Sequence, residues 1–301
     1  MMPISRRDSD FTYALMAIDY LSLEIPFSVQ RAAERQLIER AAERQLLVPT
    51  KIGKDKVPIS HLQYADDTIF LLEADDRNVE SVKKLLILFQ FVSGLAVNFE
   101  KSSLLTVGVD EAVERRWAAL LMCKIGSFPC NYLCTKVGGR SNGVGDWKFL
   151  VEKVSNKVAR WKKIHLSLAG RITLVKSVLQ SIPVYQLSIA FIPKVVIKEL
   201  NSLFSRFLWG GGTQTGGITW FKWNALCFNK KSGGLGFRNV EWFNQVLLIK
   251  WLWRFLGEGK ALWARVIKSL YGELVWGEGG ECSVAGRAGQ KGWWQKIVEK
   301  E

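Results

Sequence analysis

The chain has 301 residues, enough for two domains with buried cores. Its 42 lysines and arginines outnumber its 28 acids, which gives a formal charge of +14. This balance favours a polyanionic partner such as nucleic acid, although a basic surface that serves only solubility gives the same number. No apolar run reaches the length of a bilayer span, and the first residues lack the apolar segment of a signal peptide. We therefore expect an intracellular protein, nuclear or cytoplasmic, without a transmembrane segment.

Residues 11–47 are rich in helix-forming residues and are predicted to be helical. They contain a tandem nonapeptide, RAAERQLIE at 31–39 followed by RAAERQLLV at 40–48. Nine residues advance a helix by about two and a half turns, so a duplication rotates whatever follows by roughly half a turn. The repeat indicates either relaxed constraint on the sequence of this segment or a solvent-exposed helix in which the duplication is tolerated.

Residues 57–72 are predicted to form a β-hairpin with Asp66 and Asp67 at its tip, because β-branched and aromatic residues flank the two acids. Two carboxylates about 4 Å apart repel by about 4 kcal/mol at an effective dielectric constant near 20. A divalent cation such as Mg²⁺ removes that cost, and nucleotide polymerases present their metal ligands on such a tip. The alternative is a polar turn in which aspartate merely suits the backbone.

Residues 78–92 are predicted to form an amphipathic helix that packs on this hairpin. Its apolar face consists of Val79, Val82, Leu85, Leu86 and Phe89. After Gly108 the pattern is mainly helical, with glycine-rich loops at 139–145 and 210–217 that lack a phosphate-binding motif.

A cationic row borders the apolar row of the predicted helix at 151–161. It consists of Lys153, Lys157 and Arg160. Such a row is able to contact phosphates, and an ordinary solvated helix face has the same composition.

The five cysteines are odd in number and lack the paired short spacing of a zinc site. We expect free thiols. Most of the 13 tryptophans occur at helical spacing among aliphatic residues and are expected in the core.

Residues 61–69, which read HLQYADDTI, closely resemble the H-L-x-F/Y-A-D-D-T signature of reverse transcriptases from non-LTR (LINE-type) retrotransposons, particularly those of plants. Further segments follow in the family's order, and the resemblance covers about residues 55–275. They are FVSGLAVNFEKS at 91–102, LSLAGR at 166–171, VLQSIPVY at 178–185, FLWGG at 207–211, GGLGF at 233–237 and NQVLLIKW at 244–251.

The resemblance implies an α+β fold in which a partial polymerase palm, a β-hairpin plus helices, precedes a mainly helical region. It divides the chain into four parts. These are a degenerate helical segment at 1–56, the partial palm at 57–110, a thumb-like region at 111–209 and a Trp-rich region at 210–301.

The resemblance also implies RNA-directed DNA synthesis with an RNA template, a DNA primer and Mg²⁺. Asp66 is then the metal ligand and Asp67 its partner in the turn, while Tyr64 lies near the primer end. Lys101 takes the family's lysine position, where a cation neutralises or protonates the leaving group. The residues implied to contact the template–primer duplex in the thumb-like region are Lys153, Lys157, Arg160, Lys162 and Arg171.

The chain also departs from the family. Another metal-binding aspartate normally comes from an earlier segment of the form D-x-x-K-A-[FY]-D, and none stands before Asp66. The R-Q-G-D-P-L-S-P segment that positions the nucleotide is also missing, and residues 6–22 match at most its eroded remnant. We therefore expect a fragment, truncated at both ends and catalytically incomplete as an isolated chain. The alternatives are a non-catalytic basic nucleic-acid-binding protein and a pseudogene product without a selected function.

Overall fold

A computed structural model describes most of the chain as two compact units. Unit 1 comprises Asn131–Lys260 and Glu273–Glu301 with Met1–Pro3, and unit 2 comprises Ile4–Cys130 and Ala261–Gly272. The fold is α+β, as predicted. The four sequence regions stay predictions, and the compact units group the chain differently because residues 261–272 join the amino-terminal unit. The described residues are 13–18, 20–21, 27–64, 67–94, 96–133, 135–138, 143–161, 166–210, 218–276, 282–285 and 293–298.

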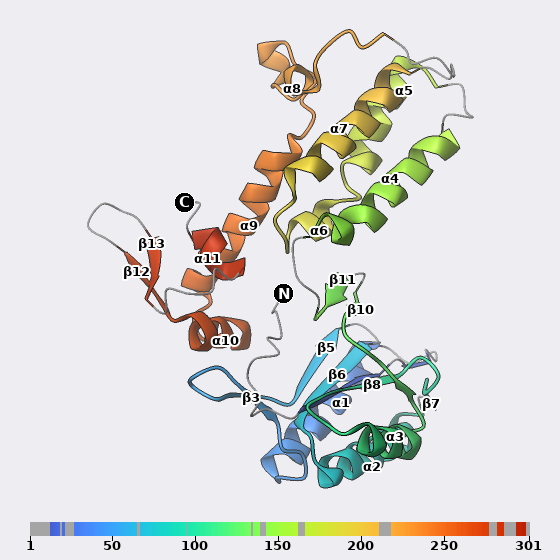
Figure 1. Ribbon diagram of the computed structural model, residues 1–301, viewed down its shortest axis with the longest axis vertical. Coiled ribbons are helices and arrows are strands. Elements are labelled where there is room, and N and C mark those ends of the chain that lie inside the picture. The colour runs from blue at the N-terminus through green and yellow to red at the C-terminus, as the bar shows by residue number, and fades with distance from the viewer. Residues whose placement is uncertain are drawn as a thin grey trace. The chain divides into compact units, whose positions relative to one another are not determined.

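Unit 2 is built on a five-stranded sheet with the order β5-β6-β1-β8-β9 (Figure 1). The strands are β1 (Tyr13–Ile18), β5 (His61–Tyr64), β6 (Asp67–Glu73), β8 (Ser103–Val107) and β9 (Lys124–Ile125). The central strand β1 pairs antiparallel with both β6 and β8, whereas β8 and β9 are parallel. β1 therefore joins the acid-bearing hairpin to the rest of the sheet.

The helical prediction for residues 11–47 is wrong at Tyr13–Ile18, which forms β1. This segment consists largely of helix-forming alanine, leucine and methionine. Pairing on both edges, with β6 and with β8, satisfies its backbone groups and overrides that local preference. The helical part of the predicted stretch is α1 (Phe27–Glu43).

Three of the described helices of unit 2 lie on one face of the sheet, where their apolar residues form a core with Ala14, Met16, Phe70 and Leu104. Besides α1 they are α2 (Asp76–Ser93) and α3 (Glu111–Leu121), which lie side by side in Figure 1. The predicted amphipathic helix is α2, and all five of its predicted apolar residues are buried. Gly94 ends α2 in the left-handed conformation that glycine adopts without strain.

A second hairpin and α10 (Leu262–Tyr271) cover part of the opposite face. β3 (Thr50–Ile52) pairs with β4 (Val57–Ile59), so residues 57–59 belong to this second hairpin. The prediction that they form part of the acid-bearing hairpin is wrong. Val57, Ile59 and Val266 form a small core that also contacts Leu71 of β6. Ser269 fixes α10 in place, because its Oγ accepts a hydrogen bond from the Asp55 N–H at 2.8 Å.

The tandem nonapeptide is accommodated because α1 ends within the second copy, at Glu43. The N–H groups of Leu46 and Gln45 bond the carbonyls of Ala41 and Ala42 at 2.9 and 3.0 Å, the pattern of a Schellman C-cap. The chain then turns, and Leu47 enters the core.

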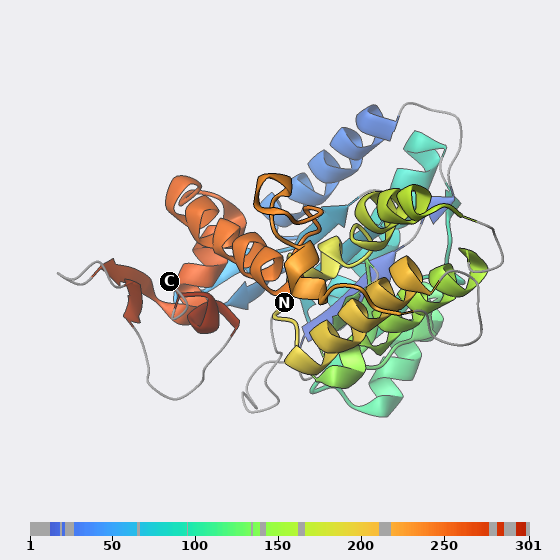
Figure 2. The ribbon, with the colours of Figure 1, turned by 90° about the horizontal axis from the view of Figure 1, so that it is seen from above.

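Unit 1 is mainly helical, as predicted for this part of the chain. Its helices are η1 (Val144–Trp147), α4 (Lys148–Trp161), α5 (Leu168–Leu174), η2 (Val175–Leu179), α6 (Val184–Leu187), α7 (Lys194–Trp209), α8 (Trp223–Leu226), η3 (Lys230–Ser232), α9 (Val240–Gly257) and α11 (Trp293–Val298). α4 and α7 lie side by side in Figures 1 and 2 and share one core with α5, η2 and the residues around α8. Two short strand pairs follow, β10 (Cys130–Tyr132) with β11 (Thr135–Val137), and β12 (Glu273–Trp276) with β13 (Cys282–Ala285), of which the second is antiparallel.

Two short strands, β2 (Tyr20–Leu21) and β7 (Ala96–Val97), also pair antiparallel in unit 2. Within the described ranges, no helix has both the length and the apolar character needed to cross a membrane. Cys123, Cys130 and Cys227 are free thiols, and burial raises the pKa of Cys123 and of Cys227 to about 11. Cys134 and the side chain of Cys282 lie outside the described residues.

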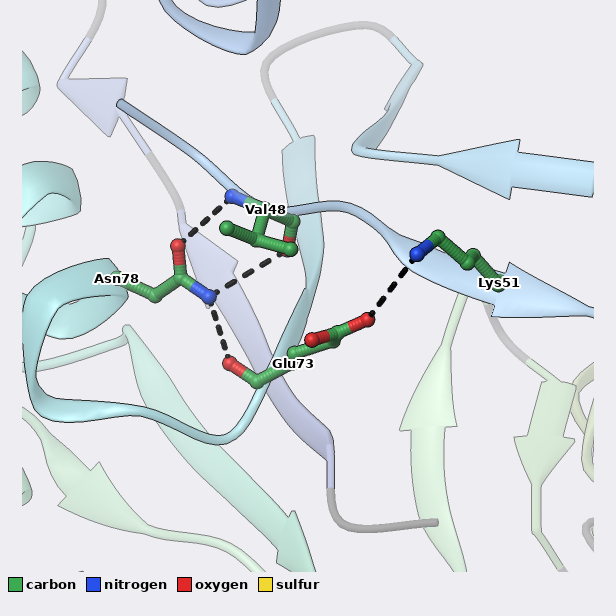
Figure 3. A network of polar contacts seen from close by, with 4 residues as sticks. All are labelled: Val48, Lys51, Glu73 and Asn78. Carbon is green, nitrogen blue, oxygen red and sulfur yellow. Dashed lines mark hydrogen bonds and ion pairs between the residues drawn. The ribbon is translucent and has the colours of Figure 1, made fainter. Parts of the chain in front are cut away.

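A buried amide connects three segments of unit 2 (Figure 3). The Asn78 side chain accepts a hydrogen bond from the Val48 N–H at 2.8 Å and donates to the carbonyls of Glu73 at 2.8 Å and Val48 at 3.4 Å. Asn78 thus fixes the start of α2 to the end of β6 and to the segment that leads into β3. The Lys51–Glu73 ion pair in the same network is exposed and 3.9 Å long.

We expect Asn78→Ala to lower the free energy of unfolding by about 2–4 kcal/mol, because buried backbone groups lose their partners. Lys51→Ala removes only an exposed ion pair and should cost less than about 0.5 kcal/mol. Urea unfolding of the two variants measures both values, and equal losses would contradict this role for Asn78.

Candidate functional site

The acid-bearing hairpin is formed by β5 and β6, with Tyr64 paired to Asp67. Ala65 and Asp66 connect the two strands in the sequence and lie outside the described residues. Side chains alternate between the two faces of a strand, and directly paired residues lie on the same face. Tyr64 and Asp67 therefore share one face of the sheet, and Gln63 and Thr68 share the other.

The face with Gln63 and Thr68 is the one that α1, α2 and α3 cover. A buried glutamate of α1 holds both residues there. The Glu34 carboxylate accepts hydrogen bonds from Thr68 Oγ1, at 3.0 Å, and from Gln63 Nε2. Glu34 is only 4% exposed, and Thr68 is buried as well. A buried carboxyl group needs such partners, so the two strands and the helix are tied together next to Asp67.

The other face is accessible near the tip. Tyr64 and Leu62 are exposed there, and Asp67 is half-buried. Farther along β6 on the same face, Leu71 packs on the β3–β4 hairpin and α10. Ile69, two residues from Asp67 on this face, is also buried, so the accessible part of the face is confined to the tip.

Lys101, the predicted cation, lies at the same end of the sheet as Asp67. Ser103, the first residue of β8, and Ile69 of β6 both pair with Ala17 of β1. Lys101 stands in the turn just before β8, and Asp67 is the first residue of β6, so both lie at this end of the sheet. Lys101 is exposed, and its backbone N–H bonds the Asn98 side chain at 3.2 Å.

His61 contributes no positive charge to this hairpin at neutral pH. Burial lowers the pKa of the imidazole, and nearby Arg35 lowers it further, while Glu39 opposes the shift. Its Nδ1 lies 3.0 Å from Ser60 Oγ.

The predicted phosphate-contacting residues belong to unit 1. Lys153 and Arg160 are exposed on α4, as a binding row requires, and Lys157 Nζ lies 5.4 Å from the centre of the Trp161 ring. Lys162 lies outside the described residues.

Arg171 has a structural contact, because its Nη1 donates to the Leu208 carbonyl at 2.8 Å and so ties α5 to α7. Its contact with nucleic acid stays a prediction.

Among the described residues, no three His, Cys, Asp or Glu side chains lie close enough together to hold a metal ion. Mg²⁺ usually takes only one or two protein carboxylates and completes its shell with phosphate and water. The accessible Asp67 fits that partial role, with Asp66 as the neighbouring acid. The metal site stays a prediction.

Glu34 is the residue of this site that the sequence analysis missed, because its segment was interpreted as relaxed or solvent-exposed. The available signal was its spacing of four from Ile38, which places both residues on one helix face. Ile38 is fully buried in the same core. The corresponding residue of the second repeat copy, Glu43, is exposed at the end of α1.

Strands β1, β5, β6 and β8 with helices α1 and α2 follow the order β-α-β-β-α-β, so unit 2 is an α+β domain of the split β-α-β class. No protein-family model matches the chain. The chain is 38% identical over 122 residues to a provisionally named ribonuclease H protein of Arabidopsis thaliana, a match that covers 40% of this chain and 20% of that protein. It is also 34% identical over 119 residues to an uncharacterized mitochondrial protein of Arabidopsis thaliana, covering 39% of this chain and 75% of that protein. The chain belongs to the family of this mitochondrial protein.

We expect Glu34→Ala to lower the free energy of unfolding by about 2–4 kcal/mol, because the buried Thr68 hydroxyl and the Gln63 amide lose a charged acceptor. Glu43→Ala, the matched change in the second repeat copy, should alter stability by less than about 0.5 kcal/mol. Thermal or urea unfolding of both variants tests this. Equal effects would mean that the carboxylate does not hold the hairpin.

Proposed function

We propose that the chain is part of a reverse transcriptase of a LINE-type plant retroelement, and that unit 2 is a partial palm. The observation that carries the proposal is the β5–β6 hairpin, whose register places Asp67 beside Tyr64 on the accessible face of the sheet. The ribonuclease H name and the plant origin of the relatives are consistent with a retroelement lineage. The chain spans only 20% of the length of the first relative. Any activity of a whole reverse transcriptase is therefore proposed for this chain and does not follow from that match.

In this proposal Asp66 and Asp67 hold Mg²⁺ together with the phosphates of an incoming nucleotide. The metal would neutralise the charge that develops on the oxygens during phosphoryl transfer. Tyr64, which is paired with Asp67, has an exposed ring on the same face, and in this proposal the substrate binds next to these two residues. Lys101, at the same end of the sheet, is a candidate for neutralising the pyrophosphate.

In this proposal unit 1 provides the contacts with nucleic acid. Lys153 and Arg160 extend from the face of α4 that is not buried, whereas Val151, Val154 and Val158 pack in the core. A row of cations on a rigid helix binds phosphates without regard to sequence. An RNA template paired with a DNA primer is the partner that the lineage predicts.

The isolated chain is proposed to be catalytically incomplete. Two-metal phosphoryl transfer needs ligands for both ions, and the described ranges contain no group of three or more His, Cys, Asp or Glu side chains that could hold a metal ion. Losing one positioned electrostatic element costs about 10²–10³-fold in rate, and an absent metal ligand should cost at least as much.

We therefore expect the chain to bind an RNA–DNA template–primer without extending the primer in Mg²⁺. Primer extension on gels tests the second part, alongside Asp66→Ala. Extension that is lost in Asp66→Ala would support Asp66 as a metal ligand. It would contradict the proposal that the isolated chain is catalytically incomplete. Extension that survives Asp66→Ala would overturn the metal assignment.

Binding to the same duplex should weaken with salt. Because each phosphate contact contributes about 0.9 to the slope of log K against log salt, the triple change Lys153→Ala, Lys157→Ala and Arg160→Ala should reduce that slope by about 3. The matched control removes three cations of unit 2, Lys54, Lys56 and Lys84, and should leave the slope near its original value. Equal reductions in both triples would show that net charge alone drives binding.

A further inference from the structure

The segment around α8 carries exposed aromatic rings next to lysines. We define the aromatic–lysine surface by the residues Trp220, Phe221, Lys222, Phe228, Lys230 and Lys231. Trp220 is 70% exposed and Phe228 is 56% exposed, although large apolar side chains are normally buried. All three lysines are exposed, and among the described residues none of them forms an ion pair.

The backbone that carries these side chains is held in place by contacts with the core of unit 1. Trp223 is 8% exposed and stacks on Phe237 at 4.9 Å, and both rings belong to the core of unit 1. The Leu226 carbonyl accepts hydrogen bonds from the N–H groups of Leu235 and Phe237, at 3.0 and 3.3 Å. The exposed rings are therefore held on an ordered turn.

Two further contacts close the turn. The Gln180 side chain donates to the Arg238 carbonyl at 3.0 Å and accepts from its N–H at 3.1 Å. Gly234 lies so close to Phe228 that a Cβ would collide with the Phe228 backbone. A larger residue at position 234 would therefore force this part of the turn to shift.

The members of the surface flank one short helix. Trp220, Phe221 and Lys222 directly precede α8, a single helical turn, and Phe228, Lys230 and Lys231 follow it closely. Figure 1 shows α8 beyond the amino-terminal end of α9. Rings and cations thus alternate along the chain on both sides of α8.

The charge of this region favours a polyanion. No acid occurs between Glu199 and Glu241, whereas the cations in that interval are Arg206, Lys222, Lys230, Lys231 and Arg238. Lysine is depleted in the cores of protein–protein interfaces, so a protein partner explains the rings but not the lysines. Single-stranded nucleic acid explains both, because bases stack on aromatic rings and phosphates bind lysines.

We propose that the aromatic–lysine surface binds single-stranded nucleic acid, with bases stacked on Trp220 and Phe228 and phosphates on Lys230 and Lys231. Paired bases in a duplex do not expose their faces for such stacking. The inference does not require that the chain be a polymerase, since it concerns residues of unit 1 that take no part in the metal site.

The test is fluorescence anisotropy of the full chain with labelled 20-nucleotide oligo(U), oligo(dT) and a blunt duplex. Trp220→Ala should weaken single-strand binding by about 5- to 150-fold, the effect of losing one stacked base. Phe91→Ala is the matched control, because Phe91 of α2 is 89% exposed. That variant should bind like the unaltered chain, and thermal unfolding should show that both variants stay folded.

The lysines are tested through salt dependence. The double change Lys230→Ala and Lys231→Ala should lower the salt slope for oligo(U) or oligo(dT) by about 1.4, from about 0.7 per phosphate contact. Lys83→Ala with Lys84→Ala removes the same charge from another adjacent pair and should leave the slope unchanged.

Three results would overturn the proposal: unchanged binding in Trp220→Ala, equal losses in the control variants, or a duplex that binds as tightly as the single strands. A difference between oligo(U) and oligo(dT) would identify RNA or DNA as the preferred strand. These binding measurements need neither a nucleotide nor a primer end, so their outcome is independent of the primer-extension result that tests the polymerase proposal.

Discussion

The buried carboxylate of Glu34 is the contact on which the arrangement of unit 2 depends most. It binds one residue from each strand of the acid-bearing hairpin, Gln63 and Thr68, and thereby fixes which face of the hairpin meets the helices. A shift of register by one residue would turn every side chain of β6 to the opposite face. Asp67 would then face the core. The orientation of the candidate site is thus set by a residue that takes no part in its chemistry.

Buried amides play a similar part in unit 1. The Asn244 side chain donates to the carbonyls of Leu187 and Ala190, at 2.7 and 2.8 Å, and accepts from the Ile192 N–H. Gln180 holds the chain at Arg238 in the same way. Both amides lie inside segments that carry the resemblance, VLQSIPVY and NQVLLIKW. These segments of unit 1 therefore encode packing, whereas the HLQYADDTI segment of unit 2 encodes both packing and the candidate chemistry.

The sequence predicted an element correctly where one local pattern dominated. Regular apolar spacing predicted α2, and β-branched flanks predicted the hairpin. It failed at β1, because the helix-forming residues of Tyr13–Ile18 become a strand only through pairing with β6 and β8, partners far away in the chain. Glu34 was missed for the same reason. Its spacing from Ile38 indicates only that it is buried; its partners Gln63 and Thr68 lie about thirty residues later, and no local rule links such positions.

The central proposal is that Asp66 and Asp67 of the hairpin bind a divalent metal. Paramagnetic Mn²⁺ is a direct probe, because it broadens the NMR signals of nuclei near its binding site. We predict selective broadening of the Tyr64 and Thr68 amide signals at low Mn²⁺, and its loss in the double variant Asp66→Asn and Asp67→Asn. Broadening that spares these amides, or that persists in the double variant, would contradict the claim.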